Sequence, residues 1–124
     1  MTLYIANSFS LNMLDLPTRE GKWFHIYVEP INPLKAKKII EKADKVVSCI
    51  GHESTAKLLS QLLGIEIKPE RRFIKLAHGD EMIIIQLTFR PEEGKVYNFQ
   101  ELLKLLEEKR ITLLHLELSD FYIP

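Results

Sequence analysis

The 124-residue chain has a single cysteine, Cys49, and no excess of charge of either sign. One thiol forms no intramolecular disulfide, and an unpaired thiol is typical of proteins in a reducing compartment. Because 17 basic residues balance 17 acidic ones, the chain lacks the bulk positive field that binds long nucleic acids or anionic membranes. No apolar run approaches the about 18 residues of a membrane-spanning helix, and the N-terminus lacks the features of a secretory signal. These absences predict one compact cytoplasmic domain, residues 1–124.

The apolar residues follow the periods of both strands and helices. Alternating or continuous apolar runs predict strands over residues 3–5, 22–29, 45–50, 71–76, 81–90 and 111–118. We expect 71–76 and 81–90 to pair antiparallel around the turn at residues 78–80. Helices are predicted over 34–42, along the leucines 58–63 before Gly64, and along 99–106 after a capping box that begins at Asn98. These elements predict an α/β (α+β) fold with a mixed central sheet of about five strands flanked by helices.

The run Ser48-Cys49-Ile50-Gly51-His52-Glu53-Ser54-Thr55 joins a predicted strand to a predicted helix. Free N–H groups at the start of a helix attract phosphate, and a glycine lets a ligand approach the backbone closely. An imidazole at this point can give or accept a proton during phosphoryl transfer. The same residues also suit an ordinary helix start, in which His52 caps the helix beside Ser54 and Thr55.

A second run, Arg90-Pro91-Glu92-Glu93-Gly94, follows the predicted strand 81–90. Proline suits the second position of a type I turn, which predicts that the Cα atoms of Arg90 and Glu93 lie within about 7 Å. An arginine clamps a phosphate through two hydrogen bonds, while a carboxylate orients it or holds a ribose hydroxyl. A surface turn with a weak ion pair explains the same residues. The cationic stretch 68–72, taken alone, is typical of a solvated strand entrance.

Other catalytic patterns are absent from the sequence. His25, His78 and His115 belong to separate predicted elements, and no HxH, HExxH or CxxC spacing occurs, so we expect no metal site. There is no P-loop, no GxGxxG and no GxSxG elbow. We therefore expect no cofactor.

Taken together, three motifs in order and spacing resemble the viral ring nucleases, the type III anti-CRISPR family of archaeal viruses and bacteriophages. The motifs are Ala6–Met13, Ile50–Thr55 and Arg90–Lys95. The resemblance runs from Leu3 to about Leu118 and leaves the segment 29–45 unmatched. Glu53 stands where the family usually has aspartate, and Pro91 where it usually has leucine.

The resemblance implies a homodimer that binds cyclic tetra-adenylate, the second messenger of type III CRISPR complexes, and cleaves it without a metal. By motif position it implies that His52 is the general acid, and that Arg90 and Glu93 are the other catalytic residues. It places a phosphate-binding arginine at Arg71 or its neighbour Arg72. The positions that match the family's ligand pocket are Asn7, Ser10, Asn12, Gly51, Ser54, Thr55 and Gln86. A viral member would act in the cytoplasm of its host.

The reaction that fits these residues is transesterification, in which each attacking ribose 2′-OH displaces the neighbouring 5′-oxygen. Two cuts would give linear di-adenylate with a 2′,3′-cyclic phosphate and shut off type III CRISPR signalling. Two alternatives remain. In the first alternative, the chain is a non-catalytic dimeric adaptor that sequesters a cyclic oligonucleotide or nucleic acid. In the second, it is a structural viral protein that kept the fold without the chemistry. A pure binder does not need His52, Arg90 and Glu93 together, so their presence favours the enzyme.

Overall fold

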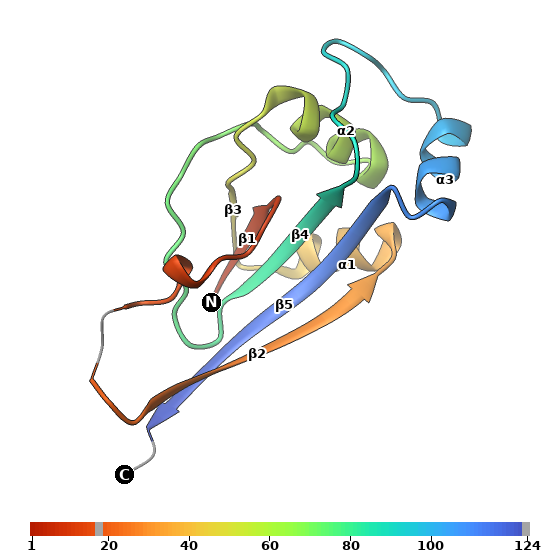
Figure 1. Cartoon of the computed structure of the whole chain (residues 1–124). Coiled ribbons are helices and arrows are strands. Elements are labelled where there is room, and N and C mark those ends of the chain that lie inside the picture. The colour runs from red at the N-terminus through yellow and green to blue at the C-terminus, as the bar shows by residue number, and fades with distance from the viewer. Residues whose placement is uncertain (17–18, 123–124) are drawn as a thin grey trace.

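The computed structural model describes residues 1–16 and 19–122, which form an α/β domain around one mixed five-stranded sheet (Figure 1). The strands lie in the order β2-β5-β4-β1-β3. Their bounds are Thr2–Ala6 for β1, Lys22–Ile31 for β2, Lys45–Ser48 for β3, Glu81–Leu87 for β4 and Ile111–Tyr122 for β5. β1 pairs parallel with β3 and β4, whereas β5 pairs antiparallel with β4 and β2. The predicted fold class, with its mixed sheet, is confirmed.

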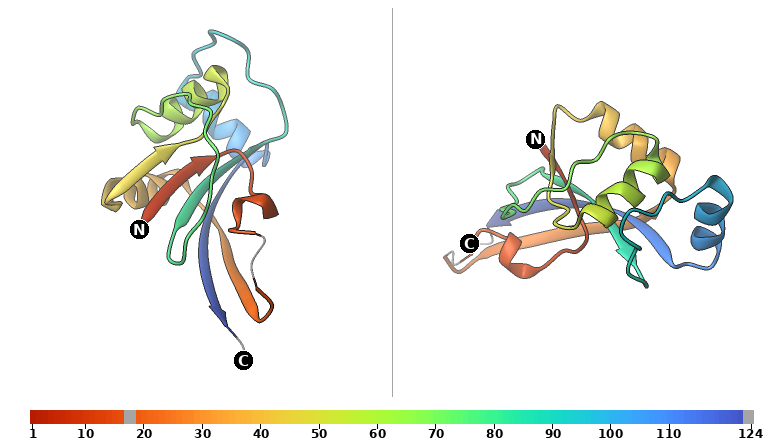
Figure 2. Two further views of the ribbon diagram at one scale, coloured as in Figure 1. Left: turned by 90° about the vertical axis from the view of Figure 1, so that its left-hand side faces the viewer. Right: turned by 90° about the horizontal axis from the view of Figure 1, so that it is seen from above.

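The helices α1, α2 and α3 cover one face of the sheet, and a short 3-10 turn, η1, lies toward the other face (Figure 2). Their bounds are Pro33–Lys42, Glu53–Leu63, Phe99–Glu107 and Leu11–Met13, respectively. Alternation along β4 builds both layers. Ile83 and Ile85 point into the core beneath the helices, and Met82 and Ile84 point into a second apolar cluster on the opposite face.

The predicted helix ends are confirmed by their capping contacts. Asn32 precedes α1 and accepts a hydrogen bond from the Lys35 N–H, and Pro33 is the first helical residue. Gly64 ends α2 in the left-handed region, at φ +70°, where it avoids the steric cost that a side chain imposes. Local sequence therefore determines where these helices start and stop.

The prediction that residues 71–76 form a strand paired with β4 is wrong. β4 already has β1 on one edge and β5 on the other, so neither of its edges is free for another strand. The segment instead crosses the sheet face opposite the helices, where Ile74 and Leu76 are buried in the second apolar cluster. In place of strand pairing, the segment forms an isolated parallel β-bridge between Leu76 and Leu14. Alternating burial over a sheet face thus produced the same apolar pattern as a strand.

The strand β2 continues through Pro30 to Ile31, beyond the predicted end at Glu29. β2 is an edge strand, and proline is tolerated there because its missing N–H can face away from the neighbouring strand. β5 is also longer than predicted, and its last residues pair with the start of β2 from Lys22 onward. The two strands form a ribbon that extends beyond the rest of the sheet (Figure 1).

Replacing Asn98 with alanine is expected to lower the free energy of unfolding by about 1 kcal/mol. The Asn98 side chain accepts a hydrogen bond from the Glu101 N–H at 2.8 Å, and the Glu101 carboxylate accepts one from the Asn98 N–H at 3.2 Å. The substitution breaks the first bond of this capping box at the start of α3. Urea denaturation measures the effect. Gln100→Ala, on the same helix and exposed, is the control, and equal losses for both variants would refute a capping role.

Candidate functional site

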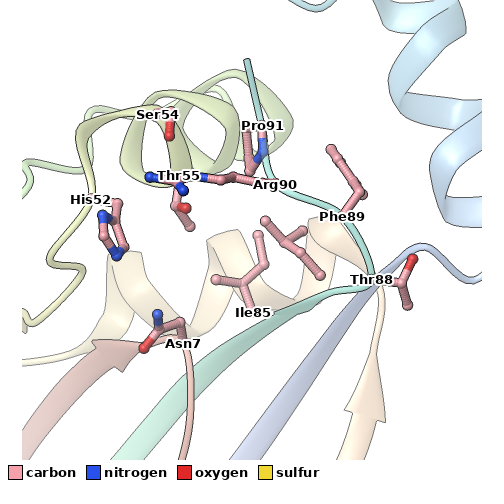
Figure 3. Close-up of a pocket in the computed structure, with 10 residues that line it drawn as sticks. Asn7, His52, Ser54, Thr55, Ile85, Thr88, Phe89, Arg90 and Pro91 are labelled. Carbon is pink, nitrogen blue, oxygen red and sulfur yellow. The ribbon is translucent and has the colours of Figure 1, made fainter. Parts of the chain in front are cut away.

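A cavity of about 620 Å³ lies at the carboxyl ends of the parallel strands β1 and β4 (Figure 3). Such ends are favourable ligand sites in α/β sheets because the chain leaves the sheet there. The lining combines the residue after β1, the start of α2, and the end of β4 with the segment that follows it. The lining residues are Asn7, His52, Ser54, Thr55, Ile85, Leu87, Thr88, Phe89, Arg90 and Pro91. The three motifs that are separate in sequence thus meet at this edge or beside it.

His52 occupies the position just before α2 without using its side chain as a cap. Its extended backbone, φ −108° and ψ 128°, lets its carbonyl accept the Ala56 N–H at 3.1 Å. The imidazole is exposed and makes no capping hydrogen bond within the described residues. His52 is therefore the N-cap residue of α2, as the interpretation of an ordinary helix start predicts, but it caps through its backbone, and its ring nitrogens are available to a ligand in the cavity.

Arg90 reaches the cavity from the segment after β4. β4 ends at Leu87, three residues earlier than predicted, and the Thr88 N–H donates to the Arg110 carbonyl at 3.1 Å, one pair beyond the last residues that β4 and β5 share. Figure 3 shows the Arg90 side chain extending toward the side on which His52 and Thr55 lie. Its guanidinium is exposed, and no carboxylate in the described part of the chain forms an ion pair with it.

Among the described residues, no backbone hydrogen bond closes the predicted turn from Arg90 to Glu93, and a hydrogen-bonded turn lies two residues later. The Lys95 N–H donates to the Glu92 carbonyl at 3.3 Å, and Gly94 has φ +73°. This conformation suits the third position of a type II turn, where glycine is favoured. Pro91 is instead buried as part of the cavity wall. Glu93 consequently lies exposed in the turn and is not among the residues that line the cavity.

Arg71 lies directly over Gly51, next to His52. A Cβ atom at position 51 would be only 3.2 Å from the Arg71 Cγ, so the glycine makes room for the arginine stem. The Glu70 N–H donates to the Ile50 carbonyl at 2.7 Å and holds the two segments together. Arg72 instead forms an ion pair with Glu70 at 2.7 Å, whereas among the described residues no ion pair of Arg71 is found. This arrangement favours Arg71 over Arg72 as the cation nearest His52.

A second cavity of about 410 Å³ adjoins the first through Asn7. It contains Ser10 and Asn12 of the first motif, and the Ser10 hydroxyl donates a hydrogen bond to the Asn12 side-chain oxygen. Cys49 also lines it, and burial raises the pKa of this thiol, so Cys49 remains protonated at neutral pH and is a poor nucleophile. Gln86 is exposed on β4 opposite Thr112 and lines neither cavity.

One cluster of titratable residues is not signalled by any spacing in the sequence. The His115 Nε2 lies 2.6 Å from a Glu81 carboxylate oxygen and 3.9 Å from one of Glu117. Candidate ligand atoms of the three residues lie within 4.8 Å of one another, so these residues, among those that the structure describes, are close enough to hold a metal ion. The pairing of β4 with β5 brings them together, with Glu81 opposite Glu117. They do not line the cavity that contains His52 and Arg90.

Comparison with known proteins points to viruses of archaeal hosts. The model of the family described as STIV B116-like matches residues 3–112. The chain is 38% identical to protein 26 of Sulfolobus islandicus filamentous virus over 94 residues, which covers 76% of this chain and 75% of that protein. It is 36% identical to protein ORF117 of Acidianus two-tailed virus over 71% of this chain and 75% of the relative.

The fold also matches a solved structure. B116 of Sulfolobus turreted icosahedral virus superposes with a TM-score of 0.81 and 27% sequence identity, covering 94% of this chain and 99% of that one. Among the described residues, no helix has both the length and the apolar character needed to cross a membrane.

Proposed function

The chain belongs to the STIV B116-like family of viral proteins, and on that premise we propose that it is a metal-independent ring nuclease. Its substrate in this proposal is cyclic tetra-adenylate, and its product is linear di-adenylate with a 2′,3′-cyclic phosphate. The observation that carries the proposal is that His52 and Arg90 line the same cavity. The His52 imidazole makes no capping hydrogen bond, and within the described residues the Arg90 guanidinium has no ion pair. Cleavage would remove the messenger of a type III CRISPR response.

In the proposed reaction, the chain's own residues supply an acid and a positive charge. The ribose 2′-OH gives up its proton to solvent water as its oxygen forms a bond to the 3′-phosphorus, and the bond from phosphorus to the 5′-oxygen breaks. Protonated His52 donates its proton to the departing 5′-oxygen, because an alkoxide is a poor leaving group. Arg90 compensates the charge that grows on the phosphoryl oxygens. Glu93 orients Arg90 or the ribose from its exposed turn.

The remaining motif residues are assigned to binding. Arg71, held over Gly51, takes a phosphate next to His52. Ser54 and Thr55 lie in the first turn of α2, where free N–H groups and the helix dipole favour an anion. Asn7, Ser10 and Asn12 contact the ligand along the second cavity. Gln86 lines neither cavity, and its assignment to ligand binding rests on its position in the family resemblance alone.

The working unit in this proposal is a homodimer. A cyclic tetramer of adenylates has a two-fold axis, and a two-fold dimer presents each pocket residue twice about the same axis. His52 and Arg90 are exposed on one chain, so a second copy is needed to enclose the ring. Two cuts on opposite sides of the ring then yield the di-adenylate.

Incubation with cyclic tetra-adenylate in excess EDTA is expected to yield linear di-adenylate at a rate similar to that without chelator. The proposed acid and cation are side chains, so removal of divalent metal ions leaves them in place. Chromatography of the products measures the outcome. Ligand that is recovered intact but bound, with and without added Mg²⁺, would favour the non-catalytic adaptor. Cleavage that requires Mg²⁺ would contradict the proposed chemistry.

A further inference from the structure

Phe73 is a phenylalanine whose side chain is completely exposed, at 101% of its reference area. It lies in the extended segment that crosses the sheet, where burial alternates. Ile74 and Leu76 point into the second apolar cluster, and Phe73 points away from it. A large apolar ring left entirely in water gains free energy from any partner that covers it.

The backbone just after Phe73 is hydrogen-bonded to the segment that carries the first motif. The Leu76 N–H donates to the Met13 carbonyl at 2.8 Å, and the Lys75 ammonium donates to the Asn12 and Leu14 carbonyls at 2.9 and 3.2 Å. These bonds tie the segment of Phe73 to the segment that carries the first motif. Residues 75 and 76, two and three positions after Phe73, are thus held next to Asn12, which keeps Phe73 near the first motif.

The surroundings of Phe73 combine an aromatic ring, cations and amides. Phe73 lines the second cavity together with Asn7, Asn12, Arg72 and Lys75. An aromatic ring near cations suits an unpaired nucleotide, because every base offers a face for stacking while its backbone is anionic. Arg72 is paired with Glu70, and the Lys75 ammonium donates to two carbonyls, so stacking on Phe73 is the main attraction. The amides of Asn7 and Asn12 can pair with the edge of a base.

We propose that Phe73 stacks on an adenine of the bound ring, and that the second cavity is a base-binding subsite. This inference rests on the proposed function and deepens it, because it names the residue that binds a base while His52 and Arg90 act on the phosphate. The Asn7 side chain joins the two cavities, so a base in one and a phosphodiester in the other belong to the same nucleotide chain. In a two-fold dimer, the two copies of Phe73 bind two opposite adenines.

The test compares Phe73→Ala with Phe73→Trp and with Phe99→Ala. Phe99 is the control because it is also exposed, at 77%, but begins α3 and lines neither cavity. Isothermal titration with cyclic tetra-adenylate is carried out in the His52→Ala background, where the ligand stays intact, and Phe73→Ala is expected there to give a dissociation constant about 5- to 150-fold higher for each base that loses its stacking partner. Phe73→Trp and Phe99→Ala are expected to stay within about 3-fold of the unaltered protein.

Kinetics and mass separate this inference from its competitors. At saturating ligand, kcat of Phe73→Ala is expected to match the unaltered protein, with the loss confined to KM. Unchanged binding by Phe73→Ala, in a protein that otherwise binds and cleaves the ring, would overturn the stacking role alone. An unaltered protein that binds no ring would overturn the proposed function itself. If Phe73→Ala were a monomer in sedimentation while the unaltered protein is a dimer, the phenyl ring of Phe73 would be covered by a second copy of the chain and not by a base.

Discussion

His52→Ala is expected to lower the single-turnover cleavage rate of cyclic tetra-adenylate by about 10²- to 10⁴-fold. The substitution removes the proposed proton donor for the departing 5′-oxygen, so the loss is expected in the chemical step. Binding is expected to stay close to that of the unaltered protein, because the phosphate contacts proposed for Arg71 and for the N–H groups of α2 do not involve the imidazole. Rapid-quench measurement of product, together with titration of the ring, separates the two effects.

His78→Ala is the matched control for His52→Ala. His78 lies in the turn before β4, where its exposed imidazole pairs with Asp120 at 3.1 Å, and it does not line the cavity. Its replacement is expected to leave the cleavage rate within about 2-fold of the unaltered protein, in keeping with surface changes outside a site. A near-normal rate for His52→Ala with intact binding would show that another group is the acid.

Arg90→Ala is expected to lower kcat by about 10²- to 10³-fold, the usual cost of removing one donor that compensates transition-state charge. The guanidinium faces the cavity and has no carboxylate partner within the described residues, so its charge is available to the phosphate. Arg90→Lys is expected to restore only part of the rate, since an ammonium cannot form two parallel hydrogen bonds to a phosphate. Steady-state kinetics over a range of ring concentrations measures kcat and KM separately.

Lys38→Ala is the control for charge in the Arg90 experiment. Lys38 is exposed on α1 and carries the same charge away from the cavity. If Arg90→Ala raised KM and left kcat unchanged, Arg90 would be a binding residue that contributes equally to ground and transition states. If Lys38→Ala lowered kcat as much as Arg90→Ala does, the net charge of the molecule, and not the position of Arg90, would account for the loss of rate.

Much of the fold could be predicted because its signals are local. The period of β4 assigns Ile83 and Met82 to opposite layers, and the capping box at Asn98 starts α3 where the sequence places it. Each of these features depends on neighbours within a few positions along the chain. Alternation and capping depend little on which distant segments pack nearby, and both predictions therefore agree with the structure.

The mistaken predictions concern partners that lie far away in the sequence. Residues 71–76 have the pattern of a strand, yet the parallel pairing of β1 with β4 removes the edge they would use. Pro30 stays within β2 because that strand is at the sheet edge. The cluster of His115 with two glutamates exists only through the pairing of β4 with β5. Which strand edges remain free is a property of the assembled sheet.

The single cysteine, the balanced charge, the helix ends and the three motifs were determined by the amino-acid sequence alone. Tertiary structure decided that His52 and Arg90 share one cavity, that Gly51 makes room for Arg71, and that Glu93 lies outside the cavity wall. It also left Phe73 in water beside the second cavity. The physical reason is that caps and periodicity arise within one or two turns of chain. A site, by contrast, needs side chains dozens of residues apart, and their distances are fixed only when the sheet is paired and the core is packed.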